Sequence, residues 1–431
     1  MRSDPGRPAR VLMAVEAWPD DRSPSDGVFL RDQARALAPH LVLGVAIGRT
    51  CSPRQWLRRG PTPTRNAVIR EEGFCVFRAE CFVATTRSRR LLSSGRVRAL
   101  ARAAEGFERL FGPPELIHAH GAAFAGEAAL EVARRRGIPV VITEHYSFVD
   151  ELLRTYGPRL LDVYEAADVL LVPSAEQSRR LRELGVCRAI RVRHNAVDAG
   201  LFAFEPIAPP APGESWRILT VTRDHEVKDV PLLMDALGRL AARGVPLDVR
   251  VVGPGEFHRA RAMSGGLGLG DRVRFVGEVP RAEVARQMGR CHLAVCSSRI
   301  ETFGMSLAEA LCAGRPVVAT DCGGPREIIG PTDGRLVATG DPEALADAIA
   351  EVLAGYRSFD QAGIARSARA RFGFEPFARA MIAEYAAAAR PADDRSGRGR
   401  RRQVPRPTAD PMAECVEPVR SCPGVAAASP A

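Results

Sequence analysis

Residues 298–329 read SRIETFGMSLAEALCAGRPVVATDCGGPREII, a segment in which a glycine-containing loop leads into a helix and then a strand. An apolar strand is expected directly before it, at 293–296. The helix is expected to begin after residues 302–306, to end near Gly314 and to lead into a second strand at 317–319. Because strand, helix and strand in this order give a parallel pair, the segment predicts one unit of an open α/β sheet.

The same alternation of short apolar runs and longer amphipathic runs extends from Val11 to about Ala388. It occurs as two series, with strands expected first at 11–15, 41–47, 116–119, 140–143 and 169–172, and then at 218–221, 247–252, 273–276, 293–296 and 317–319. Helices are expected between them, among others at 122–136, 175–183, 230–242 and 343–353. The chain is therefore expected to be an α/β protein with two open parallel sheets covered by helices.

A proline-rich break separates the two series. Residues 205–213 read EPIAPPAPG, and four prolines in this run can continue neither a helix nor a central strand. Because ligands of open α/β sheets bind outside the carboxyl ends of the strands, two such domains would face each other across a central cleft. The sequence predicts doubly wound, Rossmann-like domains at 1–208 and 214–375, a C-terminal helix at 376–390 and a disordered tail at 391–431.

Composition excludes several classes of protein. The chain is 46% hydrophobic and 26% charged, and no stretch approaches the ~18 uninterrupted apolar residues of a membrane-spanning helix. Its ten cysteines make no Cys-x-x-Cys pair, and several, such as Cys296, lie in apolar runs. A cytoplasmic protein with reduced thiols and no structural metal is therefore expected. The basic run 397–402 is interpreted as part of a solvated tail, so no nucleic acid partner is expected.

The 61 basic residues include a single lysine, Lys228. An ammonium is a compact charge that a planar guanidinium cannot replace in a tight site, so the one lysine is a candidate functional residue; chance retention is the alternative. Residues 219–229 read LTVTRDHEVKD, with Arg223 directly after an expected strand and Lys228 close to the next helix. Both cations are expected at the carboxyl edge of the second sheet, where they would neutralise a diphosphate.

The loop within 298–329 is expected to bind an anion. The backbone N–H groups of Gly304, Met305 and Ser306 would lack partners at the helix start, where the helix dipole favours a phosphate. Glu309 lies about 7.5 Å further along the axis, where its carboxylate would accept hydrogen bonds from ribose hydroxyls. Glu301 precedes the helix and would accept from a sugar on the other side of the anion. Two carboxylates around an anion site fit a nucleotide sugar; the alternative is a pair of solvated charges.

The chain resembles glycosyltransferase family 4, whose members have the two-domain GT-B fold. Five motifs carry the resemblance: Glu301 and Glu309 at Glu-x7-Glu spacing, PVVATDCGG at 316–324, Arg223 with Lys228, LIHAHG at 116–121 and HNAVD at 194–198. The resemblance implies a retaining transfer of a sugar from a nucleoside diphosphate sugar to a hydroxyl acceptor, without a catalytic metal or other cofactor. It also implies that the second domain binds the donor, that the first selects the acceptor, and that the helix at 376–390 crosses back to the first domain.

Four residues match catalytic positions of the family. Arg223 and Lys228 would stabilise the departing diphosphate, Glu301 would contact the donor sugar, and His120 would face that sugar near the reacting carbon. Breaking the anomeric bond places charge on the β-phosphate, which preorganised cations and helix-terminal N–H groups stabilise. Because the sequence contains no Asp-x-Asp pair, it offers no evident ligand set for a catalytic metal.

The resemblance also supplies substrate-binding positions: Glu309 for the ribose, Gly27 of the first loop for the diphosphate and acceptor, and the loop residues Phe303, Gly304, Met305 and Ser306. Glu144 and His145, which follow an expected strand, are candidates for the acceptor cleft. His118 is interpreted as structural and is expected on the opposite face of the strand from His120.

The loop around Arg223 departs from the family at two positions. Thr222 stands where a glycine commonly precedes the arginine, and Asp224 stands where an apolar residue is usual. Both cations are kept, but the geometry of this loop cannot be carried over from the family.

Residues 87–110 carry seven arginines against two glutamates and are expected to form a basic amphipathic helix. Such a helix would rest on an anionic membrane that presents a lipid-linked acceptor; a solvated arginine-rich helix is the alternative. The loops at 49–86 are expected to determine which acceptor is used.

Two other functions are compatible with the motifs. A nucleotide-sugar epimerase would share the architecture and would convert the donor without any acceptor. A non-catalytic binding subunit would keep the fold and bind a donor without turnover. The retained Arg223, Lys228, Glu301 and Glu309 favour the transferase.

Overall fold

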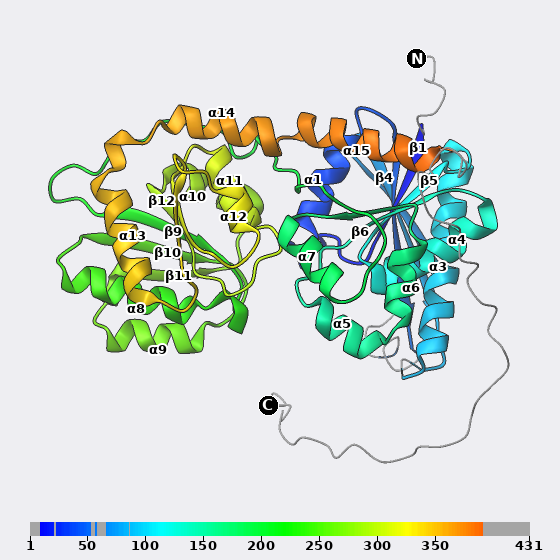
Figure 1. Ribbon diagram of the computed structural model, residues 1–431, viewed down its shortest axis with the longest axis horizontal. Coiled ribbons are helices and arrows are strands. Elements are labelled where there is room, and N and C mark those ends of the chain that lie inside the picture. Colours follow the sequence, from blue (N-terminus) through cyan, green and yellow to red (C-terminus); the bar gives the residue numbers. More distant parts are fainter. Residues whose placement is uncertain (1–8, 21–22, 53–56, 58–65, 86, 391–431) are drawn as a thin grey trace, which may run out of the picture. The chain divides into compact units, whose positions relative to one another are not determined.

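The computed structural model describes residues 9–390 except 21–22, 53–56, 58–65 and 86 (Figure 1). Within this part the chain forms an eight-stranded and a six-stranded sheet, both in one compact unit. The α/β architecture with two helix-covered sheets is therefore as predicted. The predicted disordered tail at 391–431 lies outside the described residues.

The eight-stranded sheet has the order β3-β4-β2-β1-β5-β6-β7-β8. Its strands are β1 (Arg10–Val15), β2 (Val42–Cys51), β3 (Asn66–Glu71), β4 (Phe74–Phe82), β5 (Leu116–His120), β6 (Val140–Thr143), β7 (Val169–Val172) and β8 (Ile190–Val192). The helices of this half are α1 (Val28–Leu37), α3 (Arg89–Phe111), the π-helix η1 (Ala122–Gly126), α4 (Glu127–Arg136), α5 (Val149–Tyr156), α6 (Arg159–Ala166) and α7 (Ala175–Glu183).

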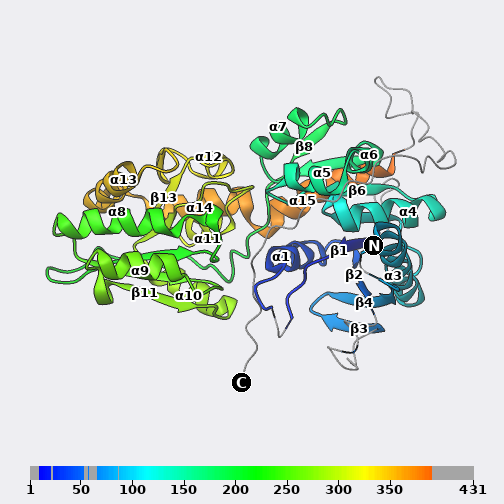
Figure 2. The ribbon, with the colours of Figure 1, turned by 90° about the horizontal axis from the view of Figure 1, so that it is seen from below.

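An antiparallel hairpin at the edge of this sheet corrects two expectations. The strands β3 and β4 pair antiparallel, with Ile69 opposite Val76, whereas the other pairs in the sheet are parallel. The sheet is thus not wholly parallel, and part of the predicted loop region 49–86 is a hairpin (Figure 2). Its turn carries Gly73 at φ 85, a conformation that glycine adopts without strain.

The six-stranded sheet is parallel throughout, with the order β11-β10-β9-β12-β13-β14. Its strands are β9 (Trp216–Val221), β10 (Leu247–Val252), β11 (Val273–Gly277), β12 (Leu293–Cys296), β13 (Val317–Thr320) and β14 (Gly334–Val337). Its helices are η2 (Glu226–Lys228), α8 (Val230–Ala242), α9 (His258–Gly266), η3 (Gly270–Arg272), α10 (Arg281–Arg290), α11 (Met305–Cys312), α12 (Pro325–Ile328), α13 (Pro342–Ala354) and η4 (Tyr356–Ser358). The strand order reverses between β9 and β12, which makes their carboxyl ends the expected ligand site.

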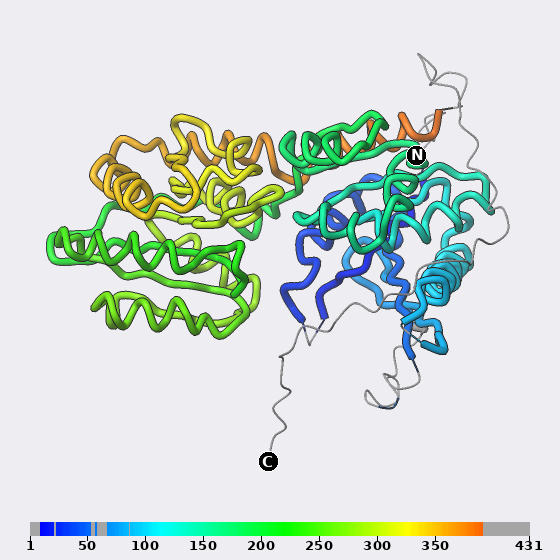
Figure 3. Tube along the Cα trace, turned by 60° about the horizontal axis from the view of Figure 1, so that its bottom comes forward, coloured from blue at the N-terminus to red at the C-terminus, as the bar shows by residue number. Residues whose placement is uncertain are grey.

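Two consecutive helices, α14 (Gln361–Phe372) and α15 (Phe374–Ala389), end the described chain. Helix α15 packs against α1, β6 and β7, so the chain returns to the eight-stranded half, as the resemblance implied. Figure 3 shows the orange end of the trace beside the blue and cyan residues of that half. The predicted domain boundaries themselves stay a prediction.

A buried carboxylate fastens α15 to the eight-stranded half. Glu384, with its side chain 2% exposed, pairs with Arg191 and Arg193, each at 2.5 Å. We expect Glu384→Ala to cost about 1–3 kcal/mol of stability, because both ion pairs are lost while the two arginines can hydrate. A lower Tm measures this loss. Glu375→Ala, at the exposed start of the same helix, is the matched control, and an equal Tm shift in both variants would contradict the assigned role.

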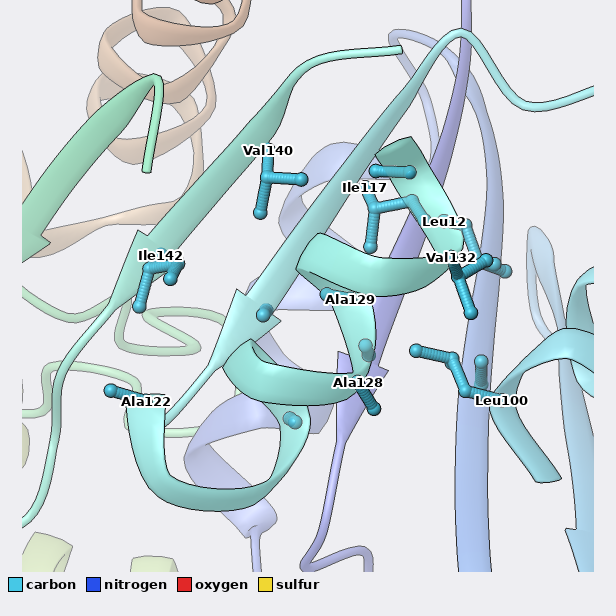
Figure 4. Packing of buried hydrophobic residues seen from close by; sticks show 14 of the residues in the cluster. Leu12, Leu100, Ile117, Ala122, Ala128, Ala129, Val132, Val140 and Ile142 are labelled. Atoms are coloured by element: carbon cyan, nitrogen blue, oxygen red, sulfur yellow. The ribbon is translucent and has the colours of Figure 1, made fainter. Parts of the chain in front are cut away.

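The two faces of the eight-stranded sheet carry separate cores. Along β1, Leu12 and Ala14 face one core while Val11 and Met13 face the other, the alternation expected of a strand buried on both sides. Helix α4 covers the first core with small residues, which lets it approach the strands closely. Figure 4 shows Ala128, Ala129 and Val132 of this helix against Leu12, Ile117, Val140 and Ile142.

Helix α3 is the predicted basic amphipathic helix, but its apolar face is not free. Its buried residues pack against β2 and β4, among them Leu100 and Phe107. The face that was expected to rest on a membrane therefore completes the core, and contact of α3 with a membrane stays a prediction. No helix in the described part of the chain is long and apolar enough to cross a membrane.

Candidate active site

Lys228 and Glu301 meet at the reversal point of the six-stranded sheet. Lys228 ends η2 after β9, and Glu301 follows β12, the neighbouring strand. The Lys228 Nζ donates to Glu301 Oε1 at 2.6 Å, and the hydroxyl of Ser298 donates to the same oxygen at 2.8 Å. Their side chains are 23% and 16% exposed, so the pair is largely screened from water. The predicted proximity of these two residues is confirmed.

The loops around Lys228 are held by several hydrogen bonds. The hydroxyl of Ser297 donates to the Lys228 carbonyl at 3.1 Å, and the Arg299 guanidinium pairs with Asp229 at 2.6 Å. Burial by itself would lower the pKa of Lys228, but Glu301 outweighs it and the pKa lies above its usual value. Lys228 therefore carries a fixed, protonated ammonium at neutral pH.

The departures at Thr222 and Asp224 have structural partners. The Asp224 carboxylate accepts the backbone N–H of Phe257 at 2.6 Å, and the Thr222 N–H donates to the Val252 carbonyl at 2.8 Å. These bonds join the loop after β9 to the loop after β10. The glycine at position 253 is required there, because a Cβ atom on it would lie 1.6 Å from the Thr222 carbonyl oxygen.

Arg223 points to the first loop of the other half. Its guanidinium lies 3.5 Å from the Asp26 carboxylate, and both side chains are about half exposed. Asp26 directly precedes Gly27, the N-cap of α1 at φ 69, where a Cβ atom would lie 2.5 Å from the Ala17 carbonyl oxygen. The predicted neighbourhood of Gly27 and the cations is therefore present, with Asp26 as a partner that the sequence did not reveal.

The start of α11 follows Glu301 closely in the chain. Gly304 is its N-cap at φ 104, and Met305 and Ser306 are its half-buried first residues. The Glu301 carbonyl accepts the Gly324 N–H at 2.9 Å, which fixes the loop before the helix. The Phe303 side chain is 3% exposed and packs on Phe372, so its predicted contact with substrate is wrong for the side chain, which is part of the core.

Glu309 is not an open acceptor at the end of this region. Its side chain is 6% exposed and pairs with Arg281 at 3.0 Å, and Arg281 also pairs with the buried Asp32 of α1. Burial raises the pKa of Glu309, and Arg281 opposes this shift. Burial likewise raises the pKa of Asp32 to about 7. Arg281 and Asp32 escaped the sequence analysis because a single charged residue at a helix start or on a helix face carries no motif.

His120 and His145 form a stacked pair at the carboxyl edge of the eight-stranded sheet. His120 Nδ1 and His145 Nε2 lie 2.9 Å apart, and Phe29 of α1 packs on His145. His120 Nε2 and His145 Nδ1 are buried and have no hydrogen-bond partner among the described residues. A buried ring nitrogen without a partner is costly, so a substrate hydroxyl is a fitting partner for His120 Nε2.

His118 is structural, as interpreted, but its predicted position is wrong. Its ring nitrogens bond to the hydroxyls of Tyr385 and Thr143 at 2.8 and 2.7 Å. Its ring centre lies 4.1 Å from that of His120, because residues two apart in a strand share one face. Glu144 is also structural, since its buried carboxylate accepts from the Ala122 N–H and the Tyr164 hydroxyl, so its predicted role in the acceptor cleft is wrong.

The three buried histidines lead to an expectation about how stability depends on pH. Burial lowers the pKa of His118 and His145 to about 3, and that of His120 well below its usual value. We expect their ring NMR signals to stay in the neutral form down to pH ~5, whereas a free histidine titrates near 6.5. The unfolded chain binds these protons and the native chain does not, so stability falls as the pH drops below about 6.5. Titration of any of the three near pH 6.5 would contradict this.

A cavity of about 860 Å³ opens beside Glu301. Its lining comes from the start of α7, including Glu176 and Arg180, and from the loops after β12 and β13, including Arg299 and Arg326. Glu301 is the one predicted site residue in its lining. Ser147 and Thr302 bridge the two halves next to it, with their hydroxyl oxygens 2.5 Å apart.

The structure thus groups the predicted residues in four sets: Lys228 with Glu301, Arg223 with the Gly27 loop, Glu309 with Arg281, and His120 with His145. No three His, Cys, Asp or Glu side chains among the described residues are grouped so that they could hold a metal ion. The positive charges described at this site come from lysine and arginine side chains.

Two family models match the chain in succession. "Glycosyltransferase Family 4" matches residues 57–201, and "Glycosyl transferases group 1" matches residues 203–368. The D-inositol 3-phosphate glycosyltransferase of Frankia alni is 30% identical over 309 residues, which cover 64% of this chain and 75% of that protein. The chain belongs to glycosyltransferase family 4. The membership that the motifs predicted is thereby confirmed.

The names of other relatives refer to related molecules. The phosphatidyl-myo-inositol mannosyltransferase of Mycolicibacterium smegmatis is 29% identical over 56% of this chain. The chain spans only about three fifths of the length of that enzyme and of its Mycobacterium leprae counterpart.

Solved structures confirm the GT-B fold of this family 4 chain. Sucrose-phosphate synthase from Thermosynechococcus elongatus superposes with a TM-score of 0.69 at 21% identity, covering 87% of this chain and 98% of that one. HepE of Anabaena, solved in complex with UDP-glucose, has a TM-score of 0.62 at 19% identity and covers 87% and 98%.

Proposed function

We propose that this chain transfers a sugar from a nucleoside diphosphate sugar to a hydroxyl group of an acceptor, with retention of the anomeric configuration and without a catalytic metal. The observation that carries the proposal is the pair of Lys228 and Glu301 at the reversal point of the six-stranded sheet. A cation for the leaving diphosphate and a carboxylate for the donor sugar stand side by side there.

The start of α11 supports the position of the diphosphate. The helix begins after Gly304, only three residues beyond Glu301, the partner of Lys228. As the anomeric bond breaks, the bonding electrons go to the β-phosphate oxygen, and the ammonium of Lys228 stabilises that charge. In this scheme Lys228 and Arg223 supply the positive charge that a metal ion supplies in other phosphate sites.

His120 supports the position of the donor sugar. It ends β5 at the reversal point of the eight-stranded sheet, and its buried Nε2 has no partner in the part of the chain that the structure describes. A sugar hydroxyl or ring oxygen satisfies this nitrogen, which is neutral because burial keeps the pKa of His120 far below neutrality. The acceptor hydroxyl then enters from the eight-stranded half, on the side of the Gly27 loop.

The relatives narrow the donor and acceptor. Three are named as mannosyltransferases, one of them GDP-mannose-dependent, and another as a D-inositol 3-phosphate glycosyltransferase. We therefore propose a nucleoside diphosphate hexose as the donor and a hydroxylated ring, free or lipid-linked, as the acceptor.

The test is donor turnover with a panel of UDP- and GDP-hexoses, with and without D-myo-inositol 3-phosphate. Proton NMR of the product is expected to show the same anomeric configuration as the donor. An excess of EDTA is expected to leave the rate of transfer unchanged. An inverted product would contradict retention, and loss of activity with EDTA would contradict metal independence. Conversion of the donor to an epimer without acceptor would replace the proposal with an epimerase.

A further inference from the structure

A second group of charged and aromatic side chains lies at the carboxyl edge of the eight-stranded sheet. The strand order of this sheet reverses between β1 and β5, as that of the other sheet does between β9 and β12. Glu16 follows β1 directly, and His120 ends β5. A ligand site is therefore expected beside Glu16 as well, next to the centre at which His120 faces the donor sugar.

Two arginines of α3 lie against two aromatic rings here. The Arg96 guanidinium carbon is 3.8 Å from the ring centre of Phe124, and that of Arg89 is 5.2 Å from the ring centre of Tyr156. The two rings contact each other edge to face, with centres 5.2 Å apart. We call these four residues the arginine–aromatic cluster. Arg96 also acts on the Tyr156 hydroxyl through a side-chain hydrogen bond. A guanidinium over a ring has several N–H groups, and those not used in this way can bind a planar or tetrahedral anion.

A small hollow adjoins the cluster. Glu16, Arg96 and Phe124 line it together with small or apolar residues, including Ala14, Ala46, Gly48, Ala125 and Ala128. Its volume of about 20 Å³ admits one water-sized group. It therefore has room for a single hydroxyl, whereas a larger ring or an anion does not fit inside it.

The positive charge of the cluster is not neutralised. Other surface arginines pair with carboxylates, such as Arg179 with Glu176, but in the described part of the chain neither Arg89 nor Arg96 forms an ion pair. Glu16 lines the same hollow as Arg96. Desolvation raises the pKa of its carboxyl and Arg96 opposes this shift, but the residue is exposed, so this one acid offsets only part of the charge of the two arginines.

We propose that the arginine–aromatic cluster is an acceptor subsite for the phosphate ester of a hydroxylated ring. Arg96 and Arg89 bind the phosphate, and the hollow beside Glu16 takes one hydroxyl of the ring. That the bound ring then accepts a sugar rests on the proposed function. The preference for a phosphorylated ring can be tested without any catalysis. The phosphate can belong to a free sugar or polyol phosphate or to a lipid headgroup, since both present the same oxygens.

The experiment is a calorimetric titration of the whole chain, with GDP or UDP present, by D-myo-inositol 3-phosphate and by unphosphorylated myo-inositol. Wild type is expected to bind the phosphorylated ring at least about tenfold more tightly, since charge-assisted hydrogen bonds are the stronger class. Arg96→Gln combined with Arg89→Gln is expected to remove this difference. Arg98→Gln, an exposed arginine of the same helix, is the matched control and is expected to keep it.

Two outcomes would overturn the subsite: a wild type that prefers neither the phosphorylated ring nor vesicles with phosphatidylinositol, or a preference that survives in the double variant. An equal loss in Arg98→Gln would assign the preference to the overall charge of α3 and would overturn it as well. Vesicles with and without phosphatidylinositol form a second arm, and a preference that appears only there assigns the phosphate to a lipid headgroup. Hydrolysis of the donor is measured in parallel. Its absence in wild type counts against the proposed function. The double variant is expected to retain it, because the subsite serves the acceptor alone.

Discussion

Replacement of Lys228 by alanine is expected to lower the rate of sugar transfer by about 10²–10³-fold, the effect of removing one preorganised group that stabilises transition-state charge. The fold is expected to survive, because Glu301 keeps its hydrogen bond from Ser298 and the loop keeps its backbone contacts. Steady-state kinetics of donor turnover measure the loss, and Tm measures the fold.

Two further variants sharpen this expectation. Lys228→Arg is expected to recover little activity, because a guanidinium is wider than an ammonium and Glu301 approaches Nζ to 2.6 Å. Arg274→Ala removes one cation from the same half at an exposed site and is expected to leave turnover nearly unchanged. Wild-type turnover in Lys228→Ala would contradict the role assigned to Lys228. An equal loss of turnover in Arg274→Ala would show that the loss comes from net charge.

Replacement of Glu309 by glutamine is expected to weaken donor binding by about tenfold or more, because the ribose loses a charged acceptor. Arg281 keeps its pairing with Asp32 in this variant, so the protein is expected to remain folded. The contact with Arg281 means that the ribose either shares the Glu309 carboxylate with the guanidinium or displaces it. Binding titrations with a nucleoside diphosphate and its 2′,3′-dideoxy analogue measure the ribose contribution directly.

The deoxy comparison separates two roles for Glu309. If its carboxylate binds the ribose, wild type discriminates against the dideoxy analogue and Glu309→Gln does not. Asp32→Asn, which removes the other carboxylate on Arg281, is expected to retain the discrimination. If Glu309 serves only to hold Arg281, Glu309→Gln will discriminate as wild type does, and the ribose assignment is wrong.

Periodicity predicted most of the elements that position the site. The bounds of β6, β7, β10, β12, α7 and α8 coincide with those read from the sequence. Three of these strands are continuous apolar runs, β10 alternates polar and apolar residues over LDVR, and the two helices are amphipathic. The hairpin of β3 and β4 was missed although β4 (FCVFRAECF) is mostly apolar, because the whole region 49–86 was interpreted as loops. The helix expected at 122–136 begins as the π-helix η1, a local change that no pattern in the sequence marks.

The candidate site could be predicted where a motif links residues that follow neighbouring strands. Lys228 and Glu301 belong to such motifs and meet as predicted. Partners that a long-range contact supplies could not be predicted: Asp32 reaches Arg281 from another half of the fold, and Phe303 is turned into the core by its contact with Phe372. The Arg96 contact with Phe124 was hidden for the same reason, since nothing in 87–110 indicates which arginines lie over a ring.

A crystal structure of the chain with a bound nucleoside diphosphate tests the central claim most directly. The account predicts the β-phosphate within hydrogen-bond reach of Lys228 Nζ and of the N–H groups at the start of α11, with the ribose hydroxyls at Glu309. A diphosphate bound instead among Arg299 and Arg326 in the neighbouring cavity of about 860 Å³ would contradict it.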